Sequence, residues 1–243
     1  MNIALEISYL GKNYSGYQVQ PNKVTVQGVL ENALEKAFGK KIATTASGRT
    51  DAGVSALCQV VNFNIETSIP AERIMYVINE NLPNDIRVMR SFEVGEDFNA
   101  RYSAKRKTYE YNFYCSNVEN AIYSEHALFV KGELDIESMK MACKLLVGEH
   151  DFTSFCASDT EVVNKVRTIY SADIIKTPFG YKFVVCGNGF LYNMVRIIMG
   201  TLLEIGYKKL KYNDILTILE QKNRAKAGPT VSSVGLMLVN VEY

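Results

Sequence analysis

Histidine is scarce in this chain, which contains only His126 and His150. Two isolated histidines do not provide the closely spaced ligands of a zinc site, so we expect no metal. The five cysteines are odd in number, widely spaced and free of any C-x-x-C pair: Cys58, Cys115, Cys143, Cys156 and Cys186. Scattered cysteines of this kind are typical of free thiols in a reducing compartment, and we therefore expect a cytoplasmic protein.

Motifs of several common enzyme classes are also missing. No G-x-S-x-G or phosphate-loop pattern occurs, and the glycines at 187 and 189 continue into an aromatic segment that fails as a dinucleotide fingerprint. No apolar run reaches membrane-spanning length, and the first residues lack the basic and apolar regions of an export leader. The net charge is only +1, so a polyanionic partner has to meet a local basic patch.

The first hundred residues show strand and helix patterns in turn. Alternating apolar residues predict strands at 3–9, 41–46, 57–65 and 86–93. A 3.6-residue apolar period predicts a helix from Thr25 to Gly39, and Pro70 opens a second helix that ends before Pro83. The resulting order, β-α-β-β-α-β, is that of a ferredoxin-like fold.

Similar elements recur after residue 100. The patterns predict strands at 109–115, 165–176, 181–187 and 236–241, and helices at 135–148, 191–205 and 213–222. We therefore predict an α+β fold of two ferredoxin-like (RRM-like) halves, residues 1–100 and 101–243. The halves are expected to share a central, mostly antiparallel sheet with helices packed on one face.

The connection at residues 46–56 brings together two groups of opposite charge. In an extended segment positions i and i+2 project to the same side, so Arg49 and Asp51 are expected to point into one space. A guanidinium beside a carboxylate favours the ionised acid, which suits a nucleophile or an electrostatic stabiliser better than a proton donor. A Gly-rich turn containing Asp is also an ordinary structural turn, so this stretch alone leaves both interpretations open.

The predicted helix at 191–205 is apolar around its whole circumference, so it should be buried. Arg196 lies in its first turns. A buried guanidinium is costly unless an anion meets it, and Asp51 or a substrate phosphate are the candidate anions. The alternative is a surface arginine whose stem covers apolar neighbours.

Tyr109 opens a strand and shares a face with Tyr111 and Phe113, which favours a core position. It also follows residues 101–107, the most basic stretch of the chain. Basic side chains that lead into an aromatic at a strand edge suit phosphate contact and base stacking. A solvated run of charge at Lys105 to Lys107 is the alternative.

Eight sequence blocks, taken together, carry a resemblance to a known family. They are Tyr9-x-Gly11, Gly16-Tyr17-Gln18, Val26-Gln27-Gly28 with Leu30-Glu31, Ser47-Gly48-Arg49-Thr50-Asp51-Ala52-Gly53-Val54, Phe98 to Ala104 leading to Tyr109, His150 to Phe155, Asn188 to Arg196 and Arg224 to Thr230. Over nearly its full length the chain resembles the TruA family of tRNA pseudouridine synthases. It departs from the usual family pattern at Tyr17, Ser55 and Asn99, where the family usually has Trp, His and His.

The resemblance implies isomerisation of uridine to pseudouridine in the tRNA anticodon stem-loop, typically at positions 38, 39 and 40, without a cofactor or metal. It implies that Asp51 is the catalytic aspartate and that Arg196 is its salt-bridge partner. Arg49 is expected to displace the target base from its stack, and Tyr109 to pack against the flipped base. The same resemblance makes Arg101 a candidate substrate-binding residue. It also implies a homodimer with tRNA lying across both subunits.

Two other functions are open at this stage. One is a non-catalytic RNA-binding module, because residues 180–186 loosely resemble the aromatic strand of an RRM, although the leading basic residue and the final aromatic are missing. The other is a carboxylate glycosidase. That chemistry needs a pair of acids, and Glu66 and Asp85 show no pairing by spacing.

Overall fold

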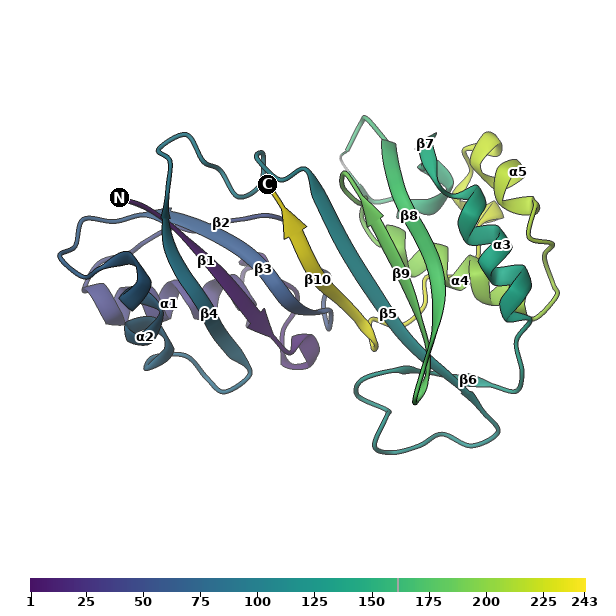
Figure 1. Cartoon of the computed structure of the whole chain (residues 1–243), viewed down its shortest axis with the longest axis horizontal. Coiled ribbons are helices and arrows are strands. Elements are labelled where there is room, and N and C mark those ends of the chain that lie inside the picture. The colour runs from purple at the N-terminus through teal and green to yellow at the C-terminus, as the bar shows by residue number, and fades with distance from the viewer. Residues whose placement is uncertain (161) are drawn as a thin grey trace. The chain divides into compact units, whose positions relative to one another are not determined.

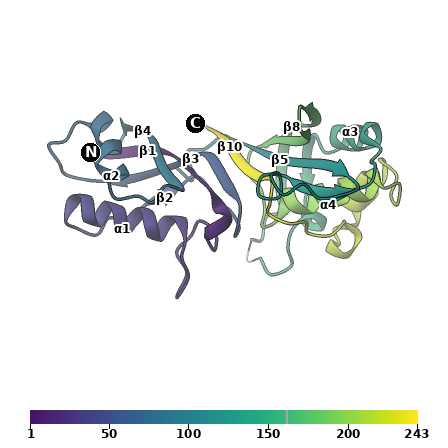
Figure 2. The same cartoon turned by 90° about the horizontal axis from the view of Figure 1, so that it is seen from below.

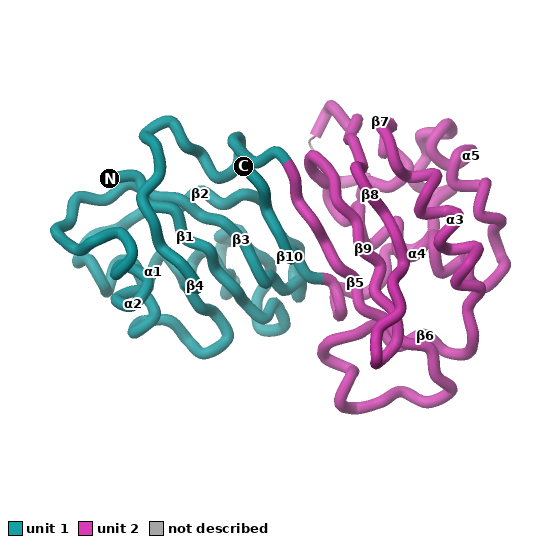
Figure 3. Tube along the Cα trace, viewed as in Figure 1, with its two compact units in different colours: residues 1–105, 237–243 teal, residues 106–236 magenta. Residues whose placement is uncertain are grey.

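The computed structural model describes residues 1–160 and 162–243. The chain is an α+β protein with a large, mixed and mostly antiparallel sheet. It divides into two compact units, shown in different colours in Figure 3. Unit 1 contains residues 1–105 and 237–243, and unit 2 contains residues 106–236.

Unit 1 is built around β1 (Asn2–Tyr9), which pairs antiparallel with β3 (Ser55–Asn64) and with β4 (Ile86–Val94). β3 also pairs with β2 (Thr45–Ala46) and, in parallel, with β10 (Leu236–Glu242), so the order along the sheet is β4-β1-β3-β10 (Figure 1). The predicted strands at 3–9, 57–65 and 86–93 are therefore confirmed.

The predicted strand at 41–46 is wrong in its length, because only Thr45 and Ala46 pair with β3. The backbone N–H and the hydroxyl of Thr44 both donate to Oε1 of Glu31, at 2.8 and 2.9 Å. A side chain from a helix thus takes the hydrogen bond that a longer strand would have given to its neighbour.

Two helices complete unit 1. α1 (Val26–Phe38) begins after Thr25, whose hydroxyl accepts from the Gly28 N–H, and ends at Gly39 in the left-handed region at φ 70°. It lies along one face of the sheet (Figure 2) and buries an apolar stripe that includes Leu30 and Leu34. α2 (Ile74–Asn79) follows a single 3₁₀ turn at Ala71–Arg73.

Unit 2 contains β5 (Arg106–Ser116), β9 (Gly180–Gly187), β8 (Val166–Thr177) and β7 (Gly148–Asp151), each antiparallel to the next in that order. β6 (Leu128–Lys131) lies parallel to β5. β6 and β7 are each four residues long and were not predicted, because such short segments carry no measurable period.

The helices of unit 2 are α3 (Ile136–Leu145), α4 (Met194–Gly206) and α5 (Asp214–Gln221). Asp135 caps α3, since its carboxylate accepts from the Ser138 N–H at 3.0 Å. α3 packs against α4 and β8. Nearly every residue of α4 is buried, as its apolar circumference predicted.

The two units differ from the predicted boundary between residues 100 and 101. Residues 101–105 and most of β10 lie in unit 1, because β10 pairs with β3 and the Lys105 N–H donates to the Glu242 carbonyl at 2.8 Å. In residues 1–160 and 162–243, no helix has the length and apolar character needed to cross a membrane.

Candidate active site

Asp51 lies half-buried on the loop between β2 and β3 of unit 1. The backbone of this loop is hydrogen-bonded to the segment that follows β1. The Tyr17 N–H donates to the Thr50 carbonyl at 3.0 Å, and the Gly53 N–H donates to the Tyr14 carbonyl at 3.3 Å. The Val54 N–H closes a tight turn on the Asp51 carbonyl at 3.1 Å. The main chain at Asp51 is therefore fixed on both sides.

Hydrogen bonds of buried side chains also hold this loop in place. The hydroxyls of Thr50 and Tyr9 are 2.8 Å apart in a buried hydrogen bond, and Gln59 bonds both the Ser47 hydroxyl and the Gly48 carbonyl. Burial raises the pKa of Tyr9, so its hydroxyl keeps its proton at neutral pH. A neutral, satisfied network of this kind makes the loop rigid.

The glycine that follows β1 allows the two segments to touch. A Cβ at Gly11 would lie 2.2 Å from the carbonyl oxygen of Val54, and the Gly11 N–H donates to the Ser55 hydroxyl at 3.0 Å. Ser55 stands where the family usually has His, and here it anchors this turn. The close approach explains why a larger residue does not fit at position 11.

We expect Gly11→Ala to destabilise the fold by about 1 to 3 kcal/mol, because the added methyl group displaces the backbone at Val54. Gly95→Ala is the matched control in the same unit, since a Cβ at Gly95 has no atom within 4 Å. Urea unfolding of both variants measures the difference. Equal midpoints for the two variants would contradict this account.

Asp85 supports the segment after β1 from the other side. Its carboxylate accepts from the Tyr14 hydroxyl at 2.6 Å and from the Asn13 amide at 3.1 Å. Burial acts to raise the pKa of Asp85, but these hydrogen bonds outweigh burial and hold it below its ordinary value of 3.8. A carboxyl with a lowered pKa stabilises the fold above its unfolded pKa and loses that effect as pH falls through the folded pKa.

We therefore expect the wild-type melting temperature to fall more steeply than that of Asp85→Asn as the pH drops below about 5 and through the folded pKa, which lies below 3.8. The amide keeps the shape and can still accept from Tyr14, but it does not titrate. Differential scanning fluorimetry across the pH range measures both slopes. Identical slopes would show that the carboxylate of Asp85 is not linked to stability.

Arg49 is exposed, and its side chain makes no hydrogen bond or ion pair within the described part of the chain. Thr50, between Arg49 and Asp51, is only 6% exposed. That Arg49 and Asp51 point into one space stays a prediction.

Tyr109 lies on β5 of unit 2 and is 8% exposed. It pairs in register with Val185 of β9, and the Phe190 ring meets its ring edge-on, with the centroids 5.1 Å apart. Tyr111 and Phe113, two and four residues on, are fully buried on the same face. The ring of Tyr109 is thus held by a packed aromatic cluster.

Arg196 lies in the first turn of α4 and is half-buried. Its Nε donates to the Val231 carbonyl at 2.8 Å, and its Nη1 donates to Oδ1 of Asn193 at 2.7 Å. The hydroxyl of Tyr111 donates to the carbonyl of Ser232, the residue that follows Val231. The two bonds made by Arg196 orient its guanidinium plane. The sequence pattern did not predict these acceptors, although Asn193 and Arg196 have the i, i+3 spacing of helix neighbours.

Two glycines bring the segment from Arg224 to Val231 against α4. A Cβ at Gly200 would lie 1.9 Å from the Pro229 carbonyl oxygen, and the Gly228 N–H donates to the Thr201 hydroxyl at 2.8 Å. Arg224 stays within its own loop, where it donates to the Gly228 carbonyl at 2.9 Å. The block from Arg224 to Thr230 therefore places the carbonyl that binds Arg196.

The five predicted site residues are divided between the units. Arg49, Asp51 and Arg101 belong to unit 1, and Tyr109 and Arg196 belong to unit 2. Arg101 is exposed, with its guanidinium 5.4 Å from the ring centroid of Tyr102. Among the described residues, no group of three or more His, Cys, Asp and Glu side chains is placed to hold a metal ion.

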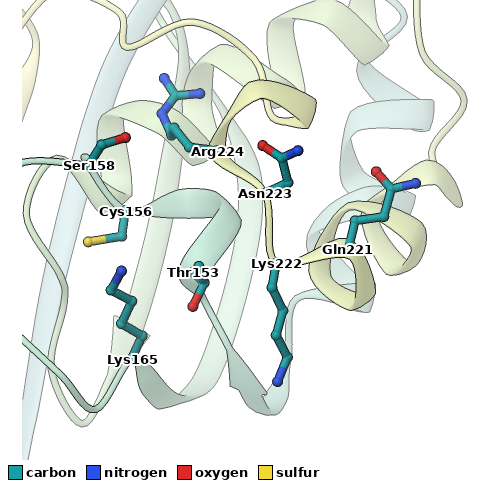
Figure 4. Close-up of a pocket in the computed structure, with 8 residues that line it drawn as sticks. All are labelled: Thr153, Cys156, Ser158, Lys165, Gln221, Lys222, Asn223 and Arg224. Carbon is teal, nitrogen blue, oxygen red and sulfur yellow. The ribbon is translucent and has the colours of Figure 1, made fainter.

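A separate hollow of about 480 Å³ lies in unit 2 (Figure 4), lined by Thr153, Cys156, Ser158, Lys165, Gln221, Lys222, Asn223 and Arg224. Two of its three basic residues already have partners. Lys222 forms an ion pair with Asp151 at 3.0 Å, and Arg224 binds backbone carbonyls. None of the predicted site residues lines it.

Comparison with known proteins identifies relatives over the whole chain. The tRNA pseudouridine synthase A of Caldicellulosiruptor saccharolyticus is 46% identical over 242 residues, covering 100% of this chain and 99% of the relative. That of Bacillus subtilis is 45% identical over 245 residues with the same coverage. A solved structure described as "Crystal structure of the archaeal box H/ACA sRNP Nop10-Cbf5 complex" aligns at 13% identity and a TM-score of 0.37, over 95% of this chain and 61% of that chain, which supports no argument.

The family described as "tRNA pseudouridine synthase" matches residues 6–103 and 142–243. These ranges include Asp51 and Arg196 and all but one of the sequence blocks in full, since Ala104 and Tyr109 of that block lie between them. Identity above 40% over the full length agrees with that match. The chain therefore belongs to the TruA family of tRNA pseudouridine synthases and is an isomerase.

Proposed function

We propose that the protein converts uridine to pseudouridine in the anticodon stem-loop of tRNA, typically at positions 38, 39 and 40, with Asp51 as the catalytic carboxylate. In this reaction the bond from C1′ to N1 breaks, the uracil turns, and a bond from C1′ to C5 forms. The proton on C5 is lost and N1 gains one. The observation that carries the proposal is a half-buried Asp51 on a loop whose backbone is bonded on both sides.

The other site residues have roles that suit their chemistry. Arg196 is the salt-bridge partner of Asp51, and this pairing rests on charge and on the family resemblance. Its bonds to Val231 and Asn193 orient the guanidinium in advance, which lowers the cost of placing a cation beside the carboxylate.

Three residues handle the RNA. Arg49, exposed on the loop of Asp51, helps displace the target base from its stack. Tyr109 packs against the flipped base. The edge-on contact with the Phe190 ring holds the Tyr109 ring in position for this. Arg101, exposed at the start of the basic stretch, contacts a phosphate.

The two ferredoxin-like halves, predicted as residues 1–100 and 101–243, share a central sheet, and residues 101–105 and 237–243 are assigned to the first half. The first carries Asp51 and the second Tyr109 and Arg196. The protein acts as a homodimer in the cytoplasm, and tRNA lies across both subunits. Two moderately basic surfaces then line one groove, which compensates for a net charge of only +1.

The test uses a tRNA transcript that carries tritium at C5 of uridine. Each conversion to pseudouridine releases one tritium to water, so the wild-type protein is expected to release a stoichiometric amount. Mapping the modified positions in the product then checks the anticodon assignment. Binding of tRNA without any tritium release would favour the RNA-binding module instead.

A further inference from the structure

We propose that Arg101 and Tyr102 form a stacking platform that receives an unpaired nucleotide of the tRNA, separate from the residues that handle the target uridine. The inference rests on the proposed function, because it assumes an RNA substrate. Its basis is the turn at residues 99–103, whose backbone is rigid while its aromatic side chain is exposed.

Asn99 builds this turn. Its Oδ1 accepts from the N–H groups of Arg101 and Tyr102, at 3.0 and 3.2 Å. The Ser103 N–H donates to the Asn99 carbonyl at 2.9 Å, and the Asn99 N–H donates to the Ser103 hydroxyl at 3.2 Å. A side chain that bonds its own backbone in this way fixes a turn. The family usually has His at this position, and Asn serves the turn here.

The centre of the turn is attached to the body of unit 1. Ala100 is fully buried, its N–H donates to the Asn62 amide oxygen at 2.9 Å, and its carbonyl accepts from the Tyr243 hydroxyl at 2.9 Å. The ring centroids of Phe98 and Tyr243 are 4.8 Å apart. The turn is therefore rigid before any ligand binds, which lowers the entropy cost of binding.

The side chains on this rigid turn face solvent. Tyr102 is 77% exposed, and the guanidinium of Arg101 lies 5.4 Å from its ring centroid. An exposed aromatic ring can stack on any nucleobase, and a neighbouring guanidinium can bind the phosphate that accompanies it. Double-stranded RNA has no free base to offer, so the platform selects an unpaired nucleotide.

Charge distinguishes this site from a similar one. Tyr76 is 53% exposed and carries Arg73 at 5.7 Å from its ring, but Glu72 and Glu80 lie four residues before and after it. Acidic side chains close to the ring in sequence repel a phosphate. Residues 101–107 instead contain four basic side chains and no acidic one. The platform at Tyr102 therefore fits a polyanion, and the pair at Tyr76 does not.

The first experiment measures kinetics on an unmodified tRNA transcript. Tyr102→Ala is expected to raise KM about 5- to 100-fold, the effect of losing one stacked base, with kcat changed less than about twofold. Tyr102→Phe keeps the ring and should restore most of the affinity. Tyr76→Ala is the matched control and should leave KM unchanged. A KM for Tyr102→Ala equal to that of Tyr76→Ala would overturn the proposal.

The second experiment uses the absence of tryptophan from the chain. Tyr102→Trp and Tyr76→Trp each introduce a single tryptophan, which long-wavelength excitation selects over the tyrosines of the chain and over RNA. The tRNA transcript should quench emission from position 102 and not from position 76, and a fully paired RNA duplex should quench neither. Unchanged emission at position 102, with wild-type protein active on the same transcript, would overturn the platform.

Emission at position 102 that changes with protein concentration alone would also overturn it, because a second copy of the chain then covers the ring. Quenching of the Tyr102→Trp variant by tRNA, together with a wild-type protein that releases no tritium, separates the two proposals. In that case the platform stands and the catalytic function fails.

Discussion

Asp51→Asn is expected to lower tritium release from uridine-labelled tRNA at least about a thousandfold, since the amide has the shape of the carboxylate but no negative charge. The loop should keep its structure. The bonds made by the backbone of residues 50, 51, 53 and 54 and by the side chains of Ser47 and Thr50 are not altered by the substitution. Binding of tRNA, measured by filter retention, should therefore change less than about threefold, because a single charge is lost.

The matched control is Asp97→Asn, which removes an exposed carboxylate from the same unit. It should release tritium at the wild-type rate and have the wild-type melting temperature. A fully active Asp51→Asn enzyme would show that this carboxylate does not take part in the chemistry. The melting curve shows whether Asp51→Asn has lost activity because it no longer folds. In that case Asp51→Glu, which keeps the negative charge, tests the role of the charge.

Arg196→Ala is expected to lower activity about a hundredfold or more and the free energy of unfolding by about 1 to 3 kcal/mol. The loss of stability follows from the carbonyl of Val231 and the amide of Asn193, which both lose their donor in a half-buried position. Arg196→Lys keeps the charge but not the planar fork, so it should recover part of the stability and little of the activity.

A double variant tests whether Arg196 and Asp51 act as a pair. If they do, Asp51→Asn with Arg196→Ala should be no slower than Asp51→Asn alone, because the guanidinium has lost the charge that it supports. Lys209→Ala is the control, since its ion pair with Glu204 lies at the surface and contributes little. Fully additive losses in the double variant would contradict the pairing.

Local patterns were enough to predict most of the elements. Thr25 and Gly39 bound α1, Asp135 caps α3, and the unbroken apolar circumference of α4 led directly to its burial. Hydrogen bonds between distant residues explain the exceptions. Glu31 shortens β2 through its bonds to Thr44, and β10 joins unit 1 through its pairing with β3.

The sequence by itself determined the family, the α+β class and the loop of Asp51, because these depend on residue order and local period. Only the tertiary structure decided how Arg196 is held, since its acceptor at Val231 is 35 residues away and reaches it through the close contact of Gly200 with Pro229. It also decided that Tyr102 is exposed while Tyr109 is buried. Both are tyrosines near basic residues, and only the packing of the remaining chain around each ring distinguishes them.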